Sequence, residues 1–211
     1  MEDICIIICY SPTKNAVFPI DNNKKTFIIN YDPKNLYVTD NAMFRIGQKW
    51  ENILWFLKNT NEWKKYNYLW FPDEDLRTTV SDIDAFCNLV IKNKLELCQP
   101  SLVKNNYVAH QSLICKNSTI PIRKNNFIEV QMPCFNKSFI NKYLIKFLEE
   151  NKNMISSAWG IDLWWSSYFK NKLYVIDAIQ IEHTKSITSN KLCREQKKYF
   201  EKKYKLNKMF T

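Results

Sequence analysis

The sequence has 211 residues, of which 45% are hydrophobic and 15% aromatic, and its formal net charge is +10. This is enough apolar material for one large domain, and no window approaches the roughly 20 apolar residues of a membrane span, which excludes a transmembrane protein. Only four of the 31 basic residues are arginine, the usual reader of phosphates and base edges, so a nucleic-acid partner is not expected.

The first half of the chain alternates apolar runs with one helical pattern. Residues 4–9 and 26–31 are short β-branched runs, each followed by a turn that contains proline, which is typical of buried strands. Residues 48–58 carry apolar side chains at helical spacing and predict an amphipathic helix. Residues 66–71 predict the next strand.

The second half continues the alternation. A helix is predicted to begin at Ser81, with Ser81 capping the first amides, Asp84 completing a capping box, and Asp82 beside them in the cap. Strands are predicted at residues 95–98, 127–132 and 173–181, and helices at 138–151, 161–169 and 191–208. Strands alternating with helices predict an α/β fold, an α/β/α sandwich around a central, mostly parallel mixed sheet.

Three consecutive carboxylates, Asp73, Glu74 and Asp75, follow the strand predicted at residues 66–71. Open α/β sheets bind their ligands at the carboxyl ends of strands. Acids clustered there repel one another unless a cation lies between them, and oxygen ligands suit Mg²⁺ or Mn²⁺. Asp73 and Asp75 are two apart on an extended chain and should point to the same side. The alternative is an ordinary acidic turn.

Five segments within residues 66–185 carry a family resemblance: YLWFPDEDL, LCQPSL, NFIEVQMPCF, SAWGIDLWW and VIDAIQIEHT. With the order of strand, helix and strand ending in D-x-D, they are similar to nucleotide-sugar glycosyltransferases of the GT-A fold, and to a GT-A-like family that is largely unassigned in function. The chain also resembles the N-terminal glycosyltransferase domain of a multidomain enzyme from a large algal DNA virus. The resemblance implies a GT-A-like, Rossmann-like fold.

The same resemblance implies a metal site. The second acid of the D-x-D pair, Asp75, would bind a cation that bridges the donor diphosphate, and Asp73 would contact the ribose or, through water, the metal. A histidine shortly after the last core strand often completes such a site, and His183 occupies that place. The alternative makes His183 a surface residue at a strand end. The implied cofactor is Mn²⁺ or Mg²⁺.

The resemblance also places the nucleotide near the ends of the first two strands. Tyr10 would stack on uracil, with Ser11 beside it in the same loop, and Asp32 would accept a hydrogen bond from N3–H. Arg45, just ahead of the helix predicted at 48–58, would reach the base or the diphosphate, unless it is a solvated basic residue. Lys49 is a further candidate for the same role.

Three tryptophans between residues 159 and 165 surround one carboxylate, Asp162. Aromatic faces suit sugar rings, and a carboxylate beside them can orient or deprotonate an acceptor hydroxyl, helped by burial that raises its pKa. In an inverting GT-A enzyme the matching acid is the general base, with Trp159 and Gly160 binding the acceptor. The alternative makes Trp164 and Trp165 core residues and Asp162 a charge at a helix N-terminus.

The two glycines of the chain, Gly47 and Gly160, both fall in these candidate segments. In a sequence so poor in glycine, they are expected at backbone positions with positive φ or with close approach of a ligand. Of the two histidines, His110 is expected to be structural or to lie on the acceptor side.

Taken together, these features predict a metal-dependent glycosyltransferase. It would move a hexose or deoxyhexose from a UDP-sugar, with UDP-glucose or UDP-rhamnose suggested by the range of the family, to a hydroxyl of a glycan or glycoside, with inversion or retention. One alternative is a metal-dependent nucleotidyltransferase or phosphohydrolase, which would more usually show a glycine-rich phosphate loop. The other is a nucleotide-sugar-binding module without activity.

Cysteine usage and charge suggest where the protein works and how it is organised. Seven scattered cysteines without a C-x-x-C pair indicate free thiols in a reducing compartment, so we expect a cytoplasmic protein, in the host cytoplasm if it is viral. Most of the excess positive charge lies in residues 191–208. We expect a glycosyltransferase domain over residues 1–190 and a basic, solvated or interdomain helix within 191–211, which could lead to further domains.

Overall fold

The computed structural model describes residues 3–12, 16–20, 26–34, 41–116, 119–186 and 189–206. Within these ranges, nine strands form one sheet in the order β3-β2-β1-β4-β8-β6-β9-β5, with β7 also paired to β9. The strands are β1 Ile4–Tyr10, β2 Thr26–Asn30, β3 Ala42–Phe44, β4 Tyr68–Trp70, β5 Leu76–Arg77, β6 Leu97–Leu102, β7 Arg123–Lys124, β8 Cys134–Asn136 and β9 Leu173–His183.

The directions of these strands bring the candidate residues together. β1 pairs in parallel with β2 and β4, β2 with β3, and β6 with β9. The short strand β8 is antiparallel to both β4 and β6, so β6 runs in the same direction as β4. β5 and β7 are antiparallel to β9. The sheet is therefore mixed and mostly parallel, as predicted, and the carboxyl ends of β1, β2, β4, β6 and β9 lie at one edge.

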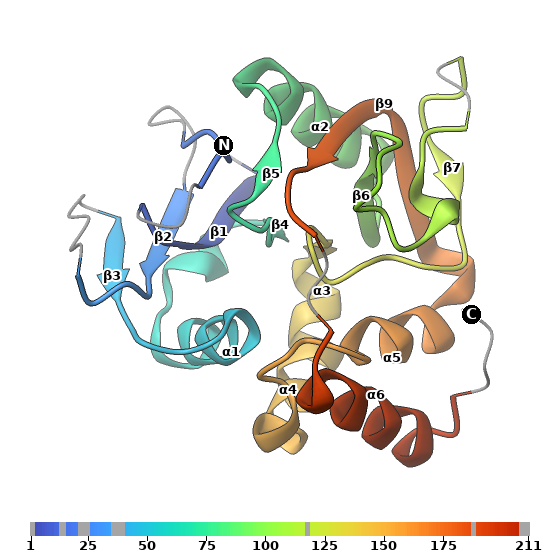
Figure 1. Cartoon of the computed structure of the whole chain (residues 1–211). Helices are drawn as coiled ribbons and strands as arrows, with labels where there is room; N and C mark the ends of the chain where they lie inside the picture. Colours follow the sequence, from blue (N-terminus) through green and yellow to red (C-terminus); the bar gives the residue numbers. More distant parts are fainter. Residues whose placement is uncertain are drawn as a thin grey trace.

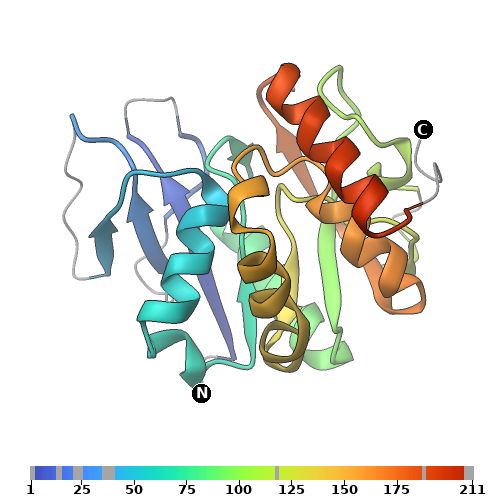
Figure 2. The same cartoon turned by 90° about the horizontal axis from the view of Figure 1, so that it is seen from below.

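Helices cover both faces of this sheet. α2 lies on one face, and α1, α3, α4 and α5 lie on the other (Figures 1 and 2), which confirms the predicted α/β/α arrangement. A π-helical turn, Ile140–Leu144, joins α3 to α4. The helices are α1 Lys49–Asn59, α2 Val80–Asn93, α3 Lys137–Phe139, α4 Ile145–Glu150, α5 Ile161–Tyr168 and α6 Lys191–Lys203. No helix among the described residues is long and apolar enough to cross a lipid bilayer.

Most predicted elements are confirmed with small changes at their ends, but the cap of α2 was assigned to the wrong residue. Thr79 precedes α2, and its hydroxyl oxygen accepts from the Asp82 amide at 3.1 Å. Its hydroxyl also donates to the Asp82 carboxylate. The extended backbone of Thr79 makes it the N-cap, and Ser81 lies inside the first turn. β3, β5 and β7, which have two or three residues each, were not predicted.

The strand predicted at residues 127–132 is wrong, because this segment is irregular between β7 and β8. It is nevertheless buried for most of its length. Side chains from other elements bond its backbone in place of a neighbouring strand: Trp165 donates to the Ile128 carbonyl at 2.7 Å, the Gln99 amide oxygen accepts from the Glu129 amide at 2.7 Å, and Trp70 donates to the Met132 carbonyl at 3.0 Å. A segment of alternating pattern can therefore be interior without belonging to a sheet.

The basic helix α6 is not simply solvated, because one of its faces is buried against the same core as α5. Phe200 is fully buried and belongs to the main hydrophobic core. The Gln196 side chain is also buried and accepts from the Ser157 amide at 2.9 Å. The last residues of the predicted helix, 207 and 208, lie outside the described residues. The division at residue 190 remains a prediction.

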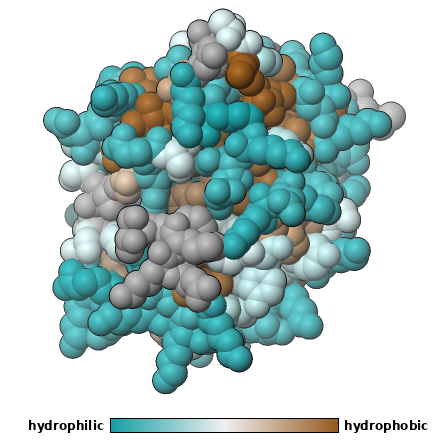
Figure 3. Space-filling model, turned by 90° about the vertical axis from the view of Figure 1, so that its right-hand side faces the viewer, coloured by the Kyte–Doolittle hydropathy of each residue, from teal (hydrophilic) through white to brown (hydrophobic). Residues whose placement is uncertain are grey.

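The surface and the cysteines agree with the composition. The face on the right of Figure 1 is mostly hydrophilic, with apolar side chains in small separate patches (Figure 3). None of the seven cysteines, all of which lie within the described residues, forms a disulfide, and six of them are buried. The expectation of cysteines without disulfides is confirmed.

A buried ion pair holds the chain at residues 112–114 to the sheet. The Arg123 guanidinium bonds the Asp177 carboxylate at 2.7 Å and donates to the carbonyls of Ser112 and Ile114 at 2.8 and 3.1 Å. Asp177 lies in β9 where its pairing with β6 shifts register, and its side chain is only 1% exposed.

Replacing Asp177 by alanine should therefore lower the free energy of unfolding by about 3 to 5 kcal/mol, because the Arg123 charge would lose its buried partner. Urea denaturation measures this change. A suitable control is Glu182→Ala, which removes the exposed pair of Arg77 and Glu182 at the edge of the same strand and should cost about 0 to 1 kcal/mol. Equal losses for the two variants would contradict the structural role of Asp177.

Candidate functional site

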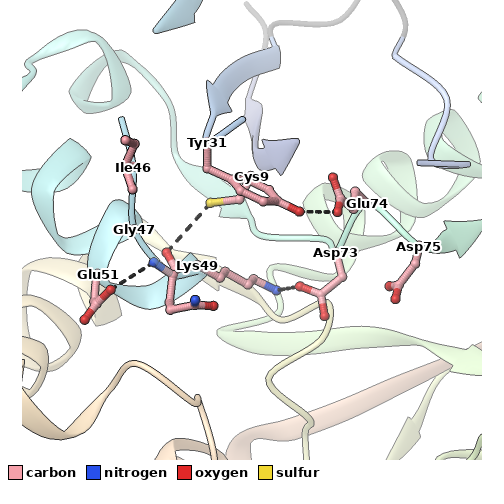
Figure 4. A pocket seen from close by; sticks show the side chains of 10 residues that line it. Cys9, Tyr31, Ile46, Gly47, Lys49, Glu51, Asp73, Glu74 and Asp75 are labelled. Carbon is pink, nitrogen blue, oxygen red and sulfur yellow. Dashed lines mark hydrogen bonds and ion pairs between the residues drawn. The ribbon is translucent and has the colours of Figure 1, made fainter. Parts of the chain in front are cut away.

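A cavity of about 370 Å³ lies at the carboxyl ends of β1, β2 and β4 (Figure 4). β1 lies between β2 and β4 and is parallel to both. The chain runs from β1 outward to β2 and β3 and then returns to β4 on the other side of β1, so the strand order reverses here. Such a switch point is where open α/β sheets hold their ligands. The lining residues are Cys9, Tyr31, Ile46, Gly47, Gln48, Lys49, Glu51, Asp73, Glu74 and Asp75.

The three acids that follow β4 have three different partners. Asp73 pairs with the Lys49 ammonium at 2.5 Å, Glu74 turns toward Tyr31, and Asp75 faces away from both (Figure 4). Asp73 and Asp75 lie on one side of the chain and Glu74 on the other, as their spacing predicts. The repulsion between the carboxylates is thus relieved in three separate ways.

Lys49, in the first turn of α1, has the most contacts of the basic candidates. Besides Asp73, its ammonium donates to the carbonyls of Val130 and Gln131 at 2.8 and 2.9 Å, so that all three donors are used. Its side chain is 15% exposed. Burial raises the pKa of Asp73, although the charge and hydrogen bond of Lys49 act to lower it.

Glu74 fastens the loop after β1. Its carboxylate accepts from the Tyr31 hydroxyl and from the Ser11 amide, and its carbonyl accepts from the amides of Val17 and Phe18 at 2.8 and 3.0 Å. Burial raises the pKa of Glu74, with the hydrogen bonds of Tyr31 and Ser11 opposing the shift. We assign it to the framework of the cavity.

Asp75 and His183 meet because β5 and β9 are paired. Leu76 lies opposite His183 in that pairing, which places the preceding residue, Asp75, beside the imidazole. The distance from His183 Nε2 to Asp75 Oδ2 is 3.7 Å. Burial acts to raise the pKa of Asp75, but His183 and Lys185 together bring it below its usual value. The sequence predicted that this strand would end at residue 181, ahead of His183; β9 instead extends to His183, its last residue.

The Asp75 and His183 pair fits a divalent cation, whereas Asp73 does not join it. Asp75 Oδ1 is buried without a hydrogen-bond partner, and His183 Nδ1 lies 3.4 Å from the Tyr107 carbonyl. A proton on Nδ1 leaves the Nε2 lone pair toward Asp75, the arrangement of a metal-binding histidine. Among the described residues, no three His, Cys, Asp or Glu side chains converge on one point. The predicted set of Asp73, Asp75 and His183 is therefore not brought together as three ligands.

Of the predicted nucleotide-binding residues, Lys49 and Asp73 line the cavity, whereas Tyr10, Ser11 and Asp32 do not. Ser11 donates from its hydroxyl to Asp32 at 3.0 Å, and both side chains are buried. The Asp32 carboxylate also accepts from the Lys34 amide at 2.9 Å. Tyr10 ends β1 and is partly buried. The aromatic residue that lines the cavity is Tyr31, which sequence reasoning missed because it counted Tyr31 as the last residue of the strand predicted at 26–31, whereas β2 ends at Asn30.

Arg45 does not line this cavity. Its guanidinium donates to the Asn52 side chain, lies 5.7 Å from the centre of the Trp55 ring, and lines a separate cavity. Gly47 does line the first cavity, and a Cβ there would lie 2.6 Å from Asn52 Oδ1 and 2.8 Å from Arg45 Nη1. The close approach of these side chains thus explains why a residue without a Cβ stands at position 47.

A second cavity, of about 140 Å³, contains the predicted acceptor residues Trp159, Gly160 and Asp162. Asp162 lies in the first turn of α5, and burial raises its pKa to about 7 against hydrogen bonds from the backbone of Leu163 and Val130. The other lining residues are Ala109, His110, Phe127, Glu129, Val130, Gln131, Leu163 and Lys197.

The neighbouring tryptophans and Gly160 have structural roles. Trp165 is fully buried, and Trp164 stacks on Phe147 with ring centres 3.8 Å apart, so the core alternative holds for both indoles. Gly160 has φ +92°, and a Cβ there would lie 3.0 Å from the Phe200 ring. Its positive φ agrees with the sequence expectation, and the close neighbour is α6.

Sequence reasoning missed Glu129, which lines the second cavity with Asp162. It is 6% exposed, and its Oε2 atom has no hydrogen-bond partner. Burial raises the pKa of Glu129 to about 8, and the nearby Asp162 charge adds to the shift. His110 lies in the same cavity, with its ring centre 4.2 Å from that of Phe127.

The two cavities share one wall. Val130 and Gln131 line the second cavity, while Lys49 and Asp73 of the first cavity bond the carbonyls of this short segment. The Gln131 amide nitrogen lies 3.3 Å from His183 Nε2. The two cavities therefore adjoin at residues 130–131.

The sequence matches no family model and no curated protein, but the fold resembles solved structures. Residues 1–349 of TarS from S. aureus, in complex with UDP-GlcNAc, match 89% of this chain with a TM-score of 0.51 and 10% identity; this chain covers 60% of that one. The chain has a GT-A-like fold.

Two further structures are similar to this GT-A-like chain at lower TM-scores. A197 from STIV has a TM-score of 0.49 and 14% identity over 85% of this chain and 84% of its own. A glycosyltransferase involved in the glycosylation of the major capsid of PBCV-1 has a TM-score of 0.45 and 11% identity over 94% and 98%.

Proposed function

We propose that this protein is a metal-dependent glycosyltransferase that uses a UDP-sugar and a glycan or glycoside acceptor. The observation that carries the proposal is the pair of adjoining cavities, one acid-lined at the switch point of a GT-A-like sheet and one containing Asp162. The structural neighbour TarS holds UDP-GlcNAc, which favours a UDP-sugar donor for this chain as well.

The first cavity would hold the donor. Its floor follows the carboxyl ends of β1 and β4, and Tyr31 supplies an aromatic face for the base. Ser11 and Asp32 lie directly behind Tyr31 and Glu74 and would fix the loop against which the nucleoside rests. Lys49 would hold Asp73 in place beside the ribose and the diphosphate.

Asp75 and His183 would hold a divalent cation, Mn²⁺ or Mg²⁺, together with oxygens of the diphosphate and water. When bound, such an ion offsets the charge that develops on the leaving diphosphate. Tyr107 would orient the His183 ring through its carbonyl.

The second cavity would hold the acceptor, with Asp162 as the general base. A carboxylate whose pKa lies near 7 can take a proton from a hydroxyl at neutral pH. The hydroxyl oxygen attacks the anomeric carbon as the bond to the diphosphate breaks, and the proton passes to Asp162. This assignment favours inversion of the anomeric centre.

Release of UDP from UDP-glucose, UDP-rhamnose and UDP-GlcNAc, with and without Mn²⁺, tests the proposal. We expect wild-type protein to release UDP from one of these donors in the presence of Mn²⁺. Asp75→Asn should bind Mn²⁺ at least about tenfold more weakly and lose the metal-dependent rate. The matched control is Asp82→Asn, since Asp82 lies outside both cavities in the cap of α2. UDP binding without turnover of any donor would instead indicate a binding module.

A further inference from the structure

Glu129 is a buried acid whose position is not explained by packing. Its amide is fixed by Gln99, and the adjacent Ile128 is held by Trp165 and Ser166, so the backbone is anchored without the carboxyl group. Glu129 is only 6% exposed, yet its Oε2 atom has no hydrogen-bond partner. A buried, unbonded carboxyl oxygen costs stability, so a structure that keeps one has unused hydrogen-bonding capacity at that point.

Glu129, which carries this unbonded oxygen, lines the second cavity. Phe127, His110 and Trp159 supply aromatic surface around the same space. The lining contains one lysine, Lys197, whose ammonium lies 3.9 Å from the Glu201 carboxylate on the next turn of α6. Two carboxyl groups and aromatic faces suit a neutral ring with hydroxyl groups, and they disfavour an anionic one.

We propose that the carboxyl group of Glu129 contacts the acceptor, and that Glu129 and Asp162 together restrict this cavity to the uncharged hydroxylated ring of a glycoside. That the bound glycoside is the acceptor of a sugar rests on the proposed function, but the binding of a glycoside ring can be measured without turnover. Because burial raises the pKa of Glu129 to about 8, its protonated carboxyl can donate one hydrogen bond while Asp162 accepts another.

The test compares wild-type protein with Glu129→Leu and Glu129→Gln. Binding of methyl β-D-glucopyranoside and methyl β-D-galactopyranoside is followed by tryptophan fluorescence, since Trp159 lines the cavity, and compared with glucose 6-phosphate and glucuronate. We expect wild-type protein to bind at least one methyl glycoside and to bind the anionic sugars at least tenfold more weakly. Glu129→Leu should weaken glycoside binding at least tenfold, and Glu129→Gln less, because the amide keeps a donor.

Two further readouts separate binding from folding. UDP affinity should be retained in both variants, because the first cavity does not include Glu129. The melting temperature of Glu129→Leu should rise by about 2 to 4 °C, since an unsatisfied buried oxygen is removed. The matched control is Glu96→Leu, which removes an exposed acid paired with Lys172 and should leave glycoside binding unchanged.

Unchanged glycoside binding in Glu129→Leu, equal binding of the anionic sugars, or no glycoside binding by wild-type protein would overturn the inference. Loss of UDP binding together with a lower melting temperature would assign Glu129 a structural role and overturn it too. Glycoside binding that depends on Glu129, in a protein that releases no UDP from any donor, would support the inference while contradicting the proposed transferase.

Discussion

Replacing Asp162 by asparagine should lower kcat for sugar transfer by about 10² to 10⁴-fold, the usual contribution of a general base. Asparagine keeps the size of the side chain and can still accept from the Leu163 amide, which bonds Asp162 Oδ1 at 2.9 Å. UDP affinity should change little because Asp162 lies outside the first cavity. Steady-state kinetics with a turned-over donor and acceptor, together with UDP titration, measures the two effects separately.

The pH dependence provides a second readout of the same role. A base acts only when deprotonated, and burial raises the pKa of Asp162 to about 7, so the wild-type rate should rise as the pH increases through about 7. The asparagine variant should lack this rise. A loss of less than about tenfold with an unchanged profile would contradict the base assignment and favour a retaining reaction, in which Asp162 only positions the acceptor.

Replacing Lys49 by methionine should reduce both turnover and stability. The ammonium bonds the Asp73 carboxylate and the carbonyls of Val130 and Gln131, so its loss would remove all three hydrogen bonds, although the Gln131 carbonyl would keep the one from the Asp73 amide. Because Asp73 is 31% exposed, we expect a loss of about 1 to 3 kcal/mol in the free energy of unfolding, less than for a fully buried pair. Turnover should fall at least tenfold, since both cavities depend on this wall.

Lys58→Met is the matched control, because Lys58 lies on the same helix and pairs with Glu149 where both side chains are 46% exposed. It should cost at most about 1 kcal/mol and leave turnover unchanged. A double-mutant cycle with Asp73→Asn isolates the coupling between Lys49 and Asp73. Additive losses would show that the two residues do not act together and would contradict this description of the wall.

Elements that form from their own sequence were predicted well. The runs in β1 and β2 are fully or nearly fully buried strands, and the apolar stripe of α1 places Trp50, Ile53 and Leu57 in the core. The position of Asp75 beside His183 could be anticipated only through the family resemblance. The pairing of β5 with β9 that brings them together involves two residues of β5, too few to leave a pattern.

The same reasoning failed where tertiary contacts override a local pattern. The pattern of residues 127–132 predicted a strand, and Glu129 received no role in it. The segment is instead an interior turn held by distant side chains, and Glu129 is buried. Likewise, Lys49 was predicted only as a further candidate to reach the base or the diphosphate. Its bonds to the carbonyls of Val130 and Gln131 could not be predicted, because these residues are about 80 positions away in the sequence.

The segment between the two cavities is held in place by residues that line neither of them. Trp70, Gln99, Trp165 and Ser166 come from three other elements, and each holds one backbone group of residues 128–132. A change at any of them would shift this segment and so alter the shape of both cavities. Substitutions at remote positions such as Ser166 would therefore reshape the second cavity while the acids that line it, Glu129 and Asp162, stay the same.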